Sequence, residues 1–364
     1  MQLTNDAFLQ VLSNFTLKKS PVYVESFGNG HINDTYKVTT TDSKTEYVLQ
    51  RINHLIFKNV DMLQNNISIV TNHIRKKLEA YGEQDIDRKV LTFLSTKDKK
   101  SYYFDGENYW RVCLMIPRSQ NFDEVNEAYS FEAGRAFGDF QAMLSDLPDW
   151  ILGETIPDFH NMEFRLLQFR EAIRTNPVGR LEEVKALVDE LESRAEGMCI
   201  QEVLYREGKL IKRTNHCDTK VNNILFDEEG KVLCVIDLDT VMPGFVLSDI
   251  GDFIRTGANT GAEDDENLDS VNVNLDIFKA YTRGYMETAQ SFLTPLEIRL
   301  LPYGGRLLTY MQTVRFLTDY INGDTYYKIH HPQHNLIRTK AQFKLLQSLE
   351  AHSVEMDGFM EDFL

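Results

Sequence analysis

The first third of the chain shows the spacing of apolar residues that is typical of strands. Short runs of β-branched and aromatic residues alternate with polar turns, which predicts strands at 23–27, 36–38, 47–49 and 110–117. The turn at 105–108 predicts a hairpin that ends in the last of these strands. From 60 to 78 apolar residues recur at steps of three and four, which predicts one amphipathic helix between the strands.

Beyond Pro117 the pattern is mainly helical. Periodic runs predict helices at 127–147, 162–175, 181–196, 276–290, 295–321 and 337–349. One hairpin interrupts them, with strands at 221–226 and 232–237 joined by a glycine-containing turn. We therefore predict an α+β fold with two lobes, a small β-rich lobe over residues 1–117 and a larger, mainly helical lobe over residues 118–364.

Composition narrows the classes of partner. The 364 residues are 42% hydrophobic and 26% charged, as in globular proteins with a sizeable core. A net charge of -16 disfavours nucleic acid and anionic membranes as partners. The four cysteines are scattered, which fits neither a disulfide framework nor a zinc site. Without a signal peptide or a membrane-spanning run, we expect a cytoplasmic monomer.

The segment that leads into the second hairpin carries the clearest chemical signal. It contains the pattern His216-x-Asp218-x4-Asn223. In phosphoryl-transfer enzymes an Asp in this pattern accepts the proton of the acceptor hydroxyl, and the Asn binds Mg²⁺. A hairpin folds back on itself, so Asp237 at its far end is expected near Asn223, and oxygen ligands of this kind suit Mg²⁺.

These residues resemble the aminoglycoside phosphotransferase and choline kinase superfamily, small-molecule kinases whose fold is similar to that of protein kinases. The segment 248–253 is similar to the Asp-Ile-Gly-Asn segment of choline kinases. The resemblance implies ATP and Mg²⁺ as cofactors, Asp218 as catalytic base, Asn223 and Asp237 as metal ligands, and Asp249 as a structural residue. It also implies that Met115 and Ile116 present their backbone to adenine, although a buried strand explains them equally.

A closer resemblance is to the N-acetylhexosamine 1-kinases. The segments that carry it are 28–36, 49–53, 156–161, 216–223 and 237–244. The resemblance implies that the acceptor is a sugar and that ATP phosphorylates the anomeric hydroxyl of N-acetylglucosamine or N-acetylgalactosamine. Two alternatives stay open: another acceptor such as choline, homoserine or an aminoglycoside, and a pseudokinase that binds nucleotide without transferring phosphate.

The loop after the first predicted strand is a candidate phosphate site. Glycines allow backbone N–H groups to face phosphate oxygens, and polar side chains add donors. We therefore expect nucleotide contacts from Gly28, Asn29, Gly30, His31, Asn33 and Thr35, while a plain β-turn is the alternative.

The next strand departs from the kinase pattern. Where protein kinases place a phosphate-binding Lys, this chain has Gln50 and Arg51. We expect Arg51 to replace the Lys, although strand alternation allows only one of the two to point inward. The helix at 60–78 holds no Glu to pair with it, which keeps the pseudokinase alternative open.

Candidates for acceptor binding come from two places. Asp158, His160 and Asn161 precede a predicted helix and offer groups for sugar hydroxyls, although Asp and Asn also cap helices. Arg306 follows two glycines inside a helical pattern, which suggests a bend that brings it to the substrate, or an ordinary kink. The run 330–334 is predicted as a surface loop near the substrate.

Overall fold

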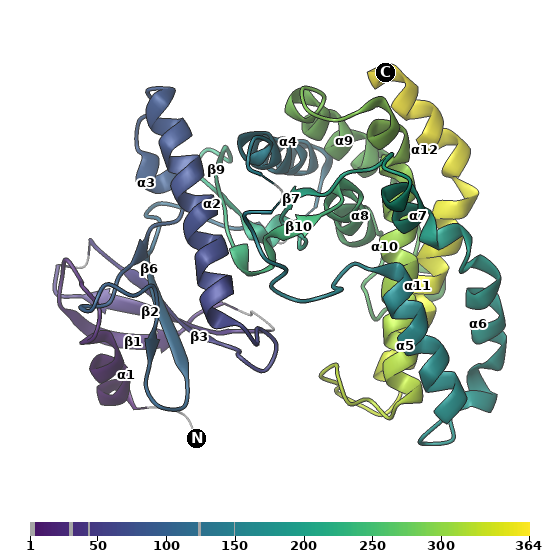
Figure 1. Ribbon diagram of the computed structural model, residues 1–364, viewed down its shortest axis with the longest axis horizontal. Coiled ribbons are helices and arrows are strands. Elements are labelled where there is room, and N and C mark those ends of the chain that lie inside the picture. The colour runs from purple at the N-terminus through teal and green to yellow at the C-terminus, as the bar shows by residue number, and fades with distance from the viewer. Residues whose placement is uncertain (1–3, 29–31, 43, 123–124, 149) are drawn as a thin grey trace. The chain divides into compact units, whose positions relative to one another are not determined.

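The computed structural model describes residues 4–28, 32–42, 44–122, 125–148 and 150–364. The chain folds into two compact units (Figure 1). The first comprises residues 1–121, 146–157 and 224–242, and the second comprises residues 122–145, 158–223 and 243–364. An antiparallel sheet dominates the first unit and helices dominate the second, which confirms the predicted α+β fold.

The sheet of the first unit has the strand order β1-β2-β3-β6-β4, with β5 paired to β6. All of these pairs are antiparallel. The strands are β1 (Pro21–Ser26), β2 (Asp34–Thr40), β3 (Tyr47–Ile52), β4 (Phe93–Leu94), β5 (Tyr103–Phe104) and β6 (Tyr109–Leu114). The predicted strands and the hairpin at 105–108 are therefore confirmed.

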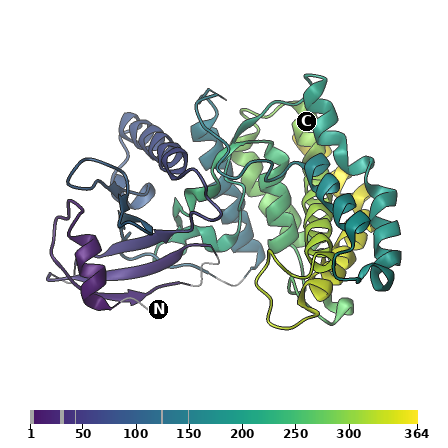
Figure 2. The same ribbon diagram turned by 60° about the horizontal axis from the view of Figure 1, so that its bottom comes forward.

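The two faces of this sheet differ because side chains alternate along each strand. One face carries Leu49 and Trp110, which pack with Phe8 of α1 (Asn5–Leu12) in the apolar core. The other face carries Gln50 and its cross-strand partner Arg111. Figure 2 shows α1 on one side of the sheet and α2 (Val60–Ala80) on the other.

Helix α2 confirms the predicted amphipathic helix, and its predicted apolar positions are buried. Asn66 on α2 also ties later segments of the chain into this unit. Its Nδ2 donates to the carbonyls of Gly153 (2.7 Å) and Val241 (3.1 Å), and its Oδ1 accepts from the N–H of Gly153 (3.1 Å). A short helix, α3 (Ile86–Lys89), follows α2.

The second hairpin is present but shorter than predicted. It consists of β8 (Ile224–Phe226) and β9 (Val232–Val235), with Ile224 paired to Val235. Residues Val221–Asn223 form a 3₁₀ turn, η2, so the prediction of a strand from 221 was wrong. After β9 the backbone of Asp237 turns left-handed and leads into a 3₁₀ turn, η3 (Leu238–Thr240).

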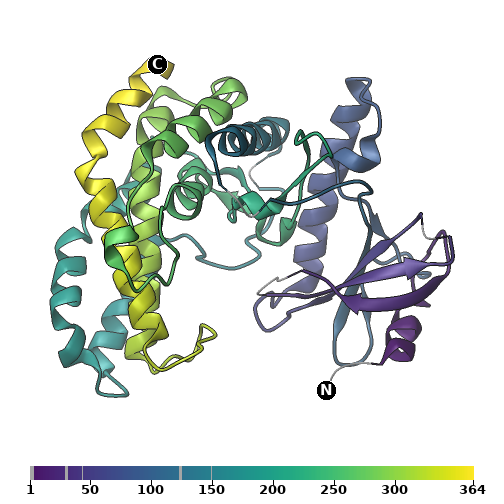
Figure 3. The same cartoon turned by 180° about the vertical axis from the view of Figure 1, so that it is seen from behind.

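The second unit is built around the long helix α10, which packs against α5, α6, α8, α11 and α12 (Figure 3). Its helices are α4 (Glu127–Leu144), α5 (Met162–Thr175), α6 (Leu181–Arg194), α7 (Ile200–Arg206), α8 (Val246–Gly257), α9 (Leu275–Ala289), α10 (Pro295–Ile321), α11 (His334–Ala351) and α12 (Ser353–Met360). The six predicted helices are confirmed, while α7, α8 and α12 were not predicted. No helix in the described part of the chain combines the length and apolar character needed to cross a bilayer.

Glycines let two pairs of helices approach closely. A Cβ atom at Gly134 of α4 would lie 2.0 Å from the carbonyl oxygen of Tyr281 on α9. A Cβ at Gly251 of α8 would lie 2.3 Å from the carbonyl oxygen of Gly304 on α10. Helix α10 runs through Gly304 and Gly305 without a break. The glycines serve close packing, and a bend there stays a prediction.

Candidate active site

Helix α8 supports the turn that carries Asp218. Asp249 on α8 is buried, and its carboxylate accepts from the N–H groups of His216 (2.8 Å) and Cys217 (2.7 Å). Cys217 has a φ of 64°, a left-handed conformation that non-glycine residues adopt only when their surroundings hold them in it. Thr219 also donates to the Asp249 carbonyl. Asp249 therefore braces the turn, as the resemblance implied.

The Asp218 carboxylate is held ionised. Its Oδ1 lies 2.8 Å from Nζ of Lys220, and its Oδ2 accepts from Nδ2 of Asn223 (3.0 Å). Burial alone would raise the pKa of Asp218, but the Lys220 charge and these hydrogen bonds outweigh it, so the pKa lies below its ordinary value. A carboxylate in this state can accept a proton at neutral pH.

The side chains of Asn223 and Asp237 suit Mg²⁺. Nδ2 of Asn223 donates to the carbonyl (2.8 Å) and the carboxylate of Asp218, so the amide oxygen points away from these bonds. Asp237 is exposed and has a φ of 58°. An amide oxygen and a carboxylate are hard ligands of the kind that Mg²⁺ prefers. Each side chain, taken within its own unit, therefore has the chemistry that the metal prediction requires.

His160 lies in a strongly positive environment in the second unit. Its Nδ1 is buried and has no hydrogen-bond partner among the described residues. Burial and the charges of Arg315, Arg165 and Arg255 lower the pKa of His160 to about 3, while Asp218 acts weakly in the opposite direction. The imidazole is therefore neutral at physiological pH and close enough to Asp218 to feel its charge.

Two arginines act on His160, and three aromatic rings lie against one of them, Arg315. The guanidinium of Arg315 lies 5.5 Å from the ring centroid of Phe159, 5.6 Å from that of Tyr327 and 5.9 Å from that of Tyr326. Burial and the charge of Arg315 lower the pKa of Arg165 to about 10. Neither arginine forms an ion pair with a carboxylate in the part of the chain that is described. We call these six residues the arginine–aromatic cluster: Phe159, His160, Arg165, Arg315, Tyr326 and Tyr327.

Of the predicted acceptor residues, only His160 belongs to this cluster. Asn161 caps α5, accepting from the N–H of Phe164 (3.1 Å), and donates to Asp158 (2.8 Å). Arg306 stands nine residues before Arg315 on α10, which puts it on the opposite side of the helix. There its Nη1 lies 3.7 Å from the Asp357 carboxylate of α12.

The predicted nucleotide residues lie in the first unit. Gly28 has a φ of 73°, whereas Asn29, Gly30 and His31 lie outside the described residues. Asn33 donates to the carboxylate of Asp239 and accepts from the N–H of Asn53 (2.9 Å). At the predicted adenine contact, the N–H of Met115 donates to the carbonyl of Glu46 (3.0 Å), and Ile116 is buried.

A buried ion pair occupies the sheet face that carries Gln50. Nη2 of Arg111 donates to Oδ2 of Asp239 (2.9 Å), its Nη1 donates to Oδ1, and its Nε donates to Gln50 (2.9 Å). Nε2 of Gln50 donates to Thr35 (3.2 Å). Arg51 points to the other face, where its Nε donates to Asp34 (2.8 Å). Strand alternation thus puts Gln50, rather than Arg51, beside the Arg111–Asp239 pair. Sequence reasoning did not identify this ion pair.

A buried acid, Glu202 on α7, supports the start of α5 near His160. Its Oε1 accepts from the N–H of Met162 (2.8 Å), while its Oε2 is buried without a partner in the described residues. Burial raises the pKa of Glu202 to about 7 from an ordinary value of 4.5. Between these values the folded chain binds more protons than the unfolded chain, so the free energy of unfolding falls as pH rises through this window.

Replacing Glu202 with Gln should remove the fall in the free energy of unfolding at high pH, because the amide keeps an acceptor for Met162 and cannot ionise. We expect the variant to gain about 2–3 kcal/mol over the wild type at pH 8 and little at pH 5, measured by urea unfolding at both pH values. Glu207→Gln, at an exposed acid paired with Lys209, is the matched control and should keep the wild-type pH dependence. Equal slopes in Glu202→Gln and wild type would contradict the assignment.

Comparison with solved structures identifies the fold. An aminoglycoside phosphotransferase from Alicyclobacillus acidocaldarius is 12% identical and matches with a TM-score of 0.60 over 100% of this chain and 98% of that one. A spectinomycin phosphotransferase in complex with ADP and spectinomycin is 13% identical, with a TM-score of 0.58 over 100% of both chains. An ethanolamine kinase from Plasmodium vivax is 13% identical, with a TM-score of 0.52 over 88% of this chain and 82% of that one. These likenesses confirm the predicted protein-kinase-like fold.

The family follows from a sequence match that includes the whole segment from Asp218 to Asp237. The model of the phosphotransferase enzyme family matches residues 24–285, well over half of the chain. The chain therefore belongs to this phosphotransferase family, whose members use ATP with Mg²⁺ to phosphorylate small molecules.

Proposed function

We propose that this phosphotransferase acts on a neutral sugar, phosphorylating the anomeric C1 hydroxyl of an N-acetylhexosamine to give the sugar 1-phosphate. The observation that carries the proposal is the arginine–aromatic cluster near Asp218. Arg255 pairs with Asp252 and Glu263, whereas Arg165 and Arg315 have no ion-pair partner among the described residues. Such a lining disfavours cationic acceptors, for which acids are needed.

A neutral sugar matches the chemistry of this cluster. Guanidinium groups donate hydrogen bonds to hydroxyl and N-acetyl carbonyl oxygens, in fixed planar geometry. Aromatic rings such as Phe159 and Tyr326 pack against the C–H faces of a sugar ring. The neutral imidazole of His160 can both donate and accept a hydrogen bond to hydroxyl groups. The resemblance to N-acetylhexosamine 1-kinases supports the same acceptor class.

In the proposed mechanism Asp218 orients the acceptor hydroxyl and takes its proton as the oxygen attacks the γ-phosphorus in line; the bond from this phosphorus to the β–γ bridging oxygen breaks and ADP leaves. Lys220 and Asn223 keep the carboxylate ionised and fix its direction. Asn223 and Asp237 would hold Mg²⁺, which would supply positive charge to offset the negative charge of the ATP phosphates. Asp249 acts through the backbone of His216 and Cys217, holding the turn in its left-handed conformation.

The nucleotide contacts stay predictions. We propose that the loop residues Gly28, Asn29, Gly30 and His31 bind phosphate through their N–H groups, with Asn33 and Thr35 beside them. Met115 and Ile116 are the proposed adenine contacts. Arg51 was the expected phosphate ligand; because it is paired with Asp34 on the other sheet face, we propose that Gln50 and Arg111 shape the phosphate side instead.

An acceptor panel tests the proposal. ADP release is measured with N-acetylglucosamine, N-acetylgalactosamine, glucose, choline, homoserine and an aminoglycoside, and phosphorus NMR identifies any product. We expect turnover with the N-acetylhexosamines and a glycosyl 1-phosphate signal. Turnover confined to choline, homoserine or the aminoglycoside would overturn the proposal, as would phosphate on C6. ATP binding without turnover on any acceptor would favour the pseudokinase alternative.

A further inference from the structure

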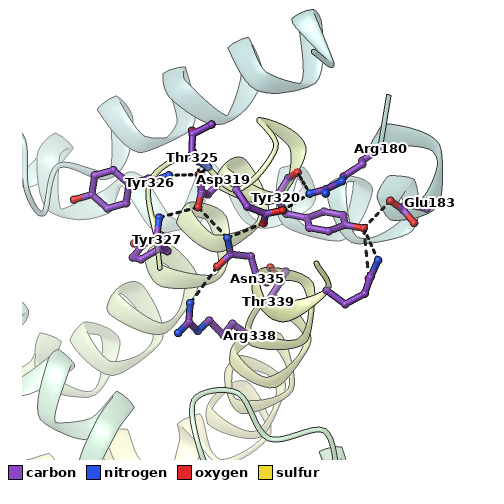
Figure 4. A network of polar contacts seen from close by, with 12 residues as sticks. Arg180, Glu183, Asp319, Tyr320, Thr325, Tyr326, Tyr327, Asn335, Arg338 and Thr339 are labelled. Atoms are coloured by element: carbon purple, nitrogen blue, oxygen red, sulfur yellow. Dashed lines mark hydrogen bonds and ion pairs between the residues drawn. The ribbon is translucent and has the colours of Figure 1, made fainter. Parts of the chain in front are cut away.

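A single buried carboxylate at the end of α10 gathers the backbone of the loop that follows (Figure 4). Asp319 Oδ1 accepts from the N–H groups of Thr325 (2.9 Å) and Tyr326 (2.8 Å). Its Oδ2 accepts from the N–H of Tyr327 (3.0 Å) and from Nδ2 of Asn335 (2.9 Å). Asp319 is only 4% exposed. Three successive N–H groups and an amide thus converge on one side chain.

The placement of this acid is unusual for a helix end. A negative charge in the last turn of a helix is unfavourable, because it faces the negative end of the helix dipole. At Asp319 the backbone donors and Asn335, with a longer bond from the Thr325 hydroxyl (3.5 Å), offset this cost, and charge-assisted hydrogen bonds are stronger than neutral ones. The carboxylate therefore accepts its hydrogen bonds from the loop and from Asn335 rather than from water.

The turn between α10 and this loop is fixed as well. Gly323 and Asp324 both have positive φ, 89° and 61°, and reverse the chain. Asp324 accepts from Nη1 of Arg180 at the start of α6 (2.5 Å) and from Nδ2 of Asn335 on α11 (2.8 Å). The path of the loop is therefore determined at its beginning by Asp324 and further along by Asp319.

The fixed loop carries two members of the arginine–aromatic cluster. Arg315 and Asp319 are four residues apart on α10 and so share one helix face. Folding the loop back onto Asp319 returns Tyr326 and Tyr327 to that face, where their rings lie against the Arg315 guanidinium. Gln312, one turn earlier, accepts from Arg315 (3.1 Å) and donates to the hydroxyl of Tyr327 (3.1 Å).

We infer that Asp319 is a positioning residue for the acceptor: by holding the N–H groups of residues 325–327, it places Tyr326 and Tyr327 on Arg315 and so shapes the acceptor side of the site. The inference rests on the proposed function, which puts the acceptor at this cluster. Asp319 does not touch the acceptor and takes no part in proton transfer. Its effect should therefore appear in acceptor binding and selectivity, with the chemical step left intact.

Asp319→Asn is the direct test. The amide matches the carboxylate in shape, but its nitrogen would face the donors Tyr327 N–H and Asn335 Nδ2, so these two hydrogen bonds are lost. We expect the acceptor KM to rise about tenfold or more, with kcat at saturating acceptor and the KM for ATP changed less than about threefold. Amide hydrogen exchange at residues 325–327 should accelerate in the same variant.

Asp105→Asn is the matched control. The Asp105 carboxylate also braces a turn, accepting from the N–H groups of Glu107 (2.9 Å) and Asn108 (2.7 Å), but in the β5–β6 hairpin. The variant Asp105→Asn should leave the acceptor KM unchanged. If Asp319→Asn does not fold, Asn335→Ala removes one donor to the same carboxylate and is expected to raise the acceptor KM in the same direction.

The outcomes separate this inference from the proposed function. Equal changes in kcat, acceptor KM and ATP KM would overturn it, since they indicate a general structural role. Faster exchange at 325–327 with an unchanged acceptor KM would overturn it too. If the wild-type chain phosphorylates an acceptor other than a sugar, the proposed function fails alone, and the same KM comparison is made with that acceptor. If no acceptor is phosphorylated, calorimetric affinity for N-acetylglucosamine replaces KM, and equal affinity in wild type and variant overturns the inference.

Discussion

Asp218→Asn should lower kcat about a thousandfold or more, within the range typical of losing a general base. The amide has nearly the shape of the carboxylate but cannot accept the proton of the acceptor hydroxyl. Lys220, which lies 2.8 Å from the carboxylate, would lose its counter-charge without being displaced far. Initial rates of ADP release at saturating acceptor measure the effect.

Two comparisons make this result specific to the base. The KM for ATP should stay within about threefold of the wild-type value, because Asp218 is not a proposed nucleotide ligand. Asp189→Asn makes the same exchange at an exposed acid paired with Lys185 on α6 and should leave kcat unchanged. If Asp218→Asn retains more than about a tenth of kcat, another group must take the proton.

Arg111→Met should destabilise the chain by about 3–5 kcal/mol, the usual cost of removing one partner from a buried ion pair. Arg111 and Asp239 are 2% and 3% exposed, so the remaining carboxylate would have neither water nor its counter-charge. Burial disfavours the charged form of Arg111, but the negative charge of Asp239 outweighs this effect. The pKa of Arg111 therefore lies above its ordinary value. Urea unfolding at pH 7 gives the free energy of unfolding.

Arg51→Met is the matched control for this prediction. Arg51 lies on the neighbouring strand and pairs with Asp34, but its side chain is 38% exposed, so its loss should cost no more than about 1 kcal/mol. Combining Arg111→Met with Asp239→Leu should recover much of the lost stability, because no unpaired charge stays buried. Equal costs for Arg111→Met and Arg51→Met would contradict the buried pair.

The fold was predictable wherever one face of an element meets the core and the other meets water. Helix α2 shows this pattern, and its predicted and observed bounds nearly coincide. Helix α8 was missed because almost every residue from Val246 to Gly257 is buried, which removes the polar face on which periodicity depends. The hairpin at 224–235 was predicted, but its membership of the first unit depends on long-range contacts such as the pairing of Phe226 with Gln120.

Some residues of the candidate site could be predicted from the sequence, and others could not. Asp218 and Asn223 lie within one short motif, and this motif together with the hairpin that follows it predicted their chemistry. The arginine–aromatic cluster combines the segment before α5, the middle of α10 and the loop after it, and only tertiary packing joins these segments. Arg111 could have been noticed as one charge in the apolar run from Trp110 to Leu114, although nothing nearby in the sequence indicated Asp239 as its partner.

The close contact between α8 and α10 holds the turn of Asp218 at a set distance from the arginine–aromatic cluster. Asp249 on α8 braces the catalytic turn, and Arg315 on α10 anchors the arginine–aromatic cluster. Since Gly251 and Gly304 bring the two backbones together, side-chain substitutions cannot adjust the spacing between base and cluster without separating the helices. If the acceptor binds at the cluster as proposed, we expect differences in acceptor preference to arise in the loops at 158–161 and 322–333 rather than in the spacing between α8 and α10.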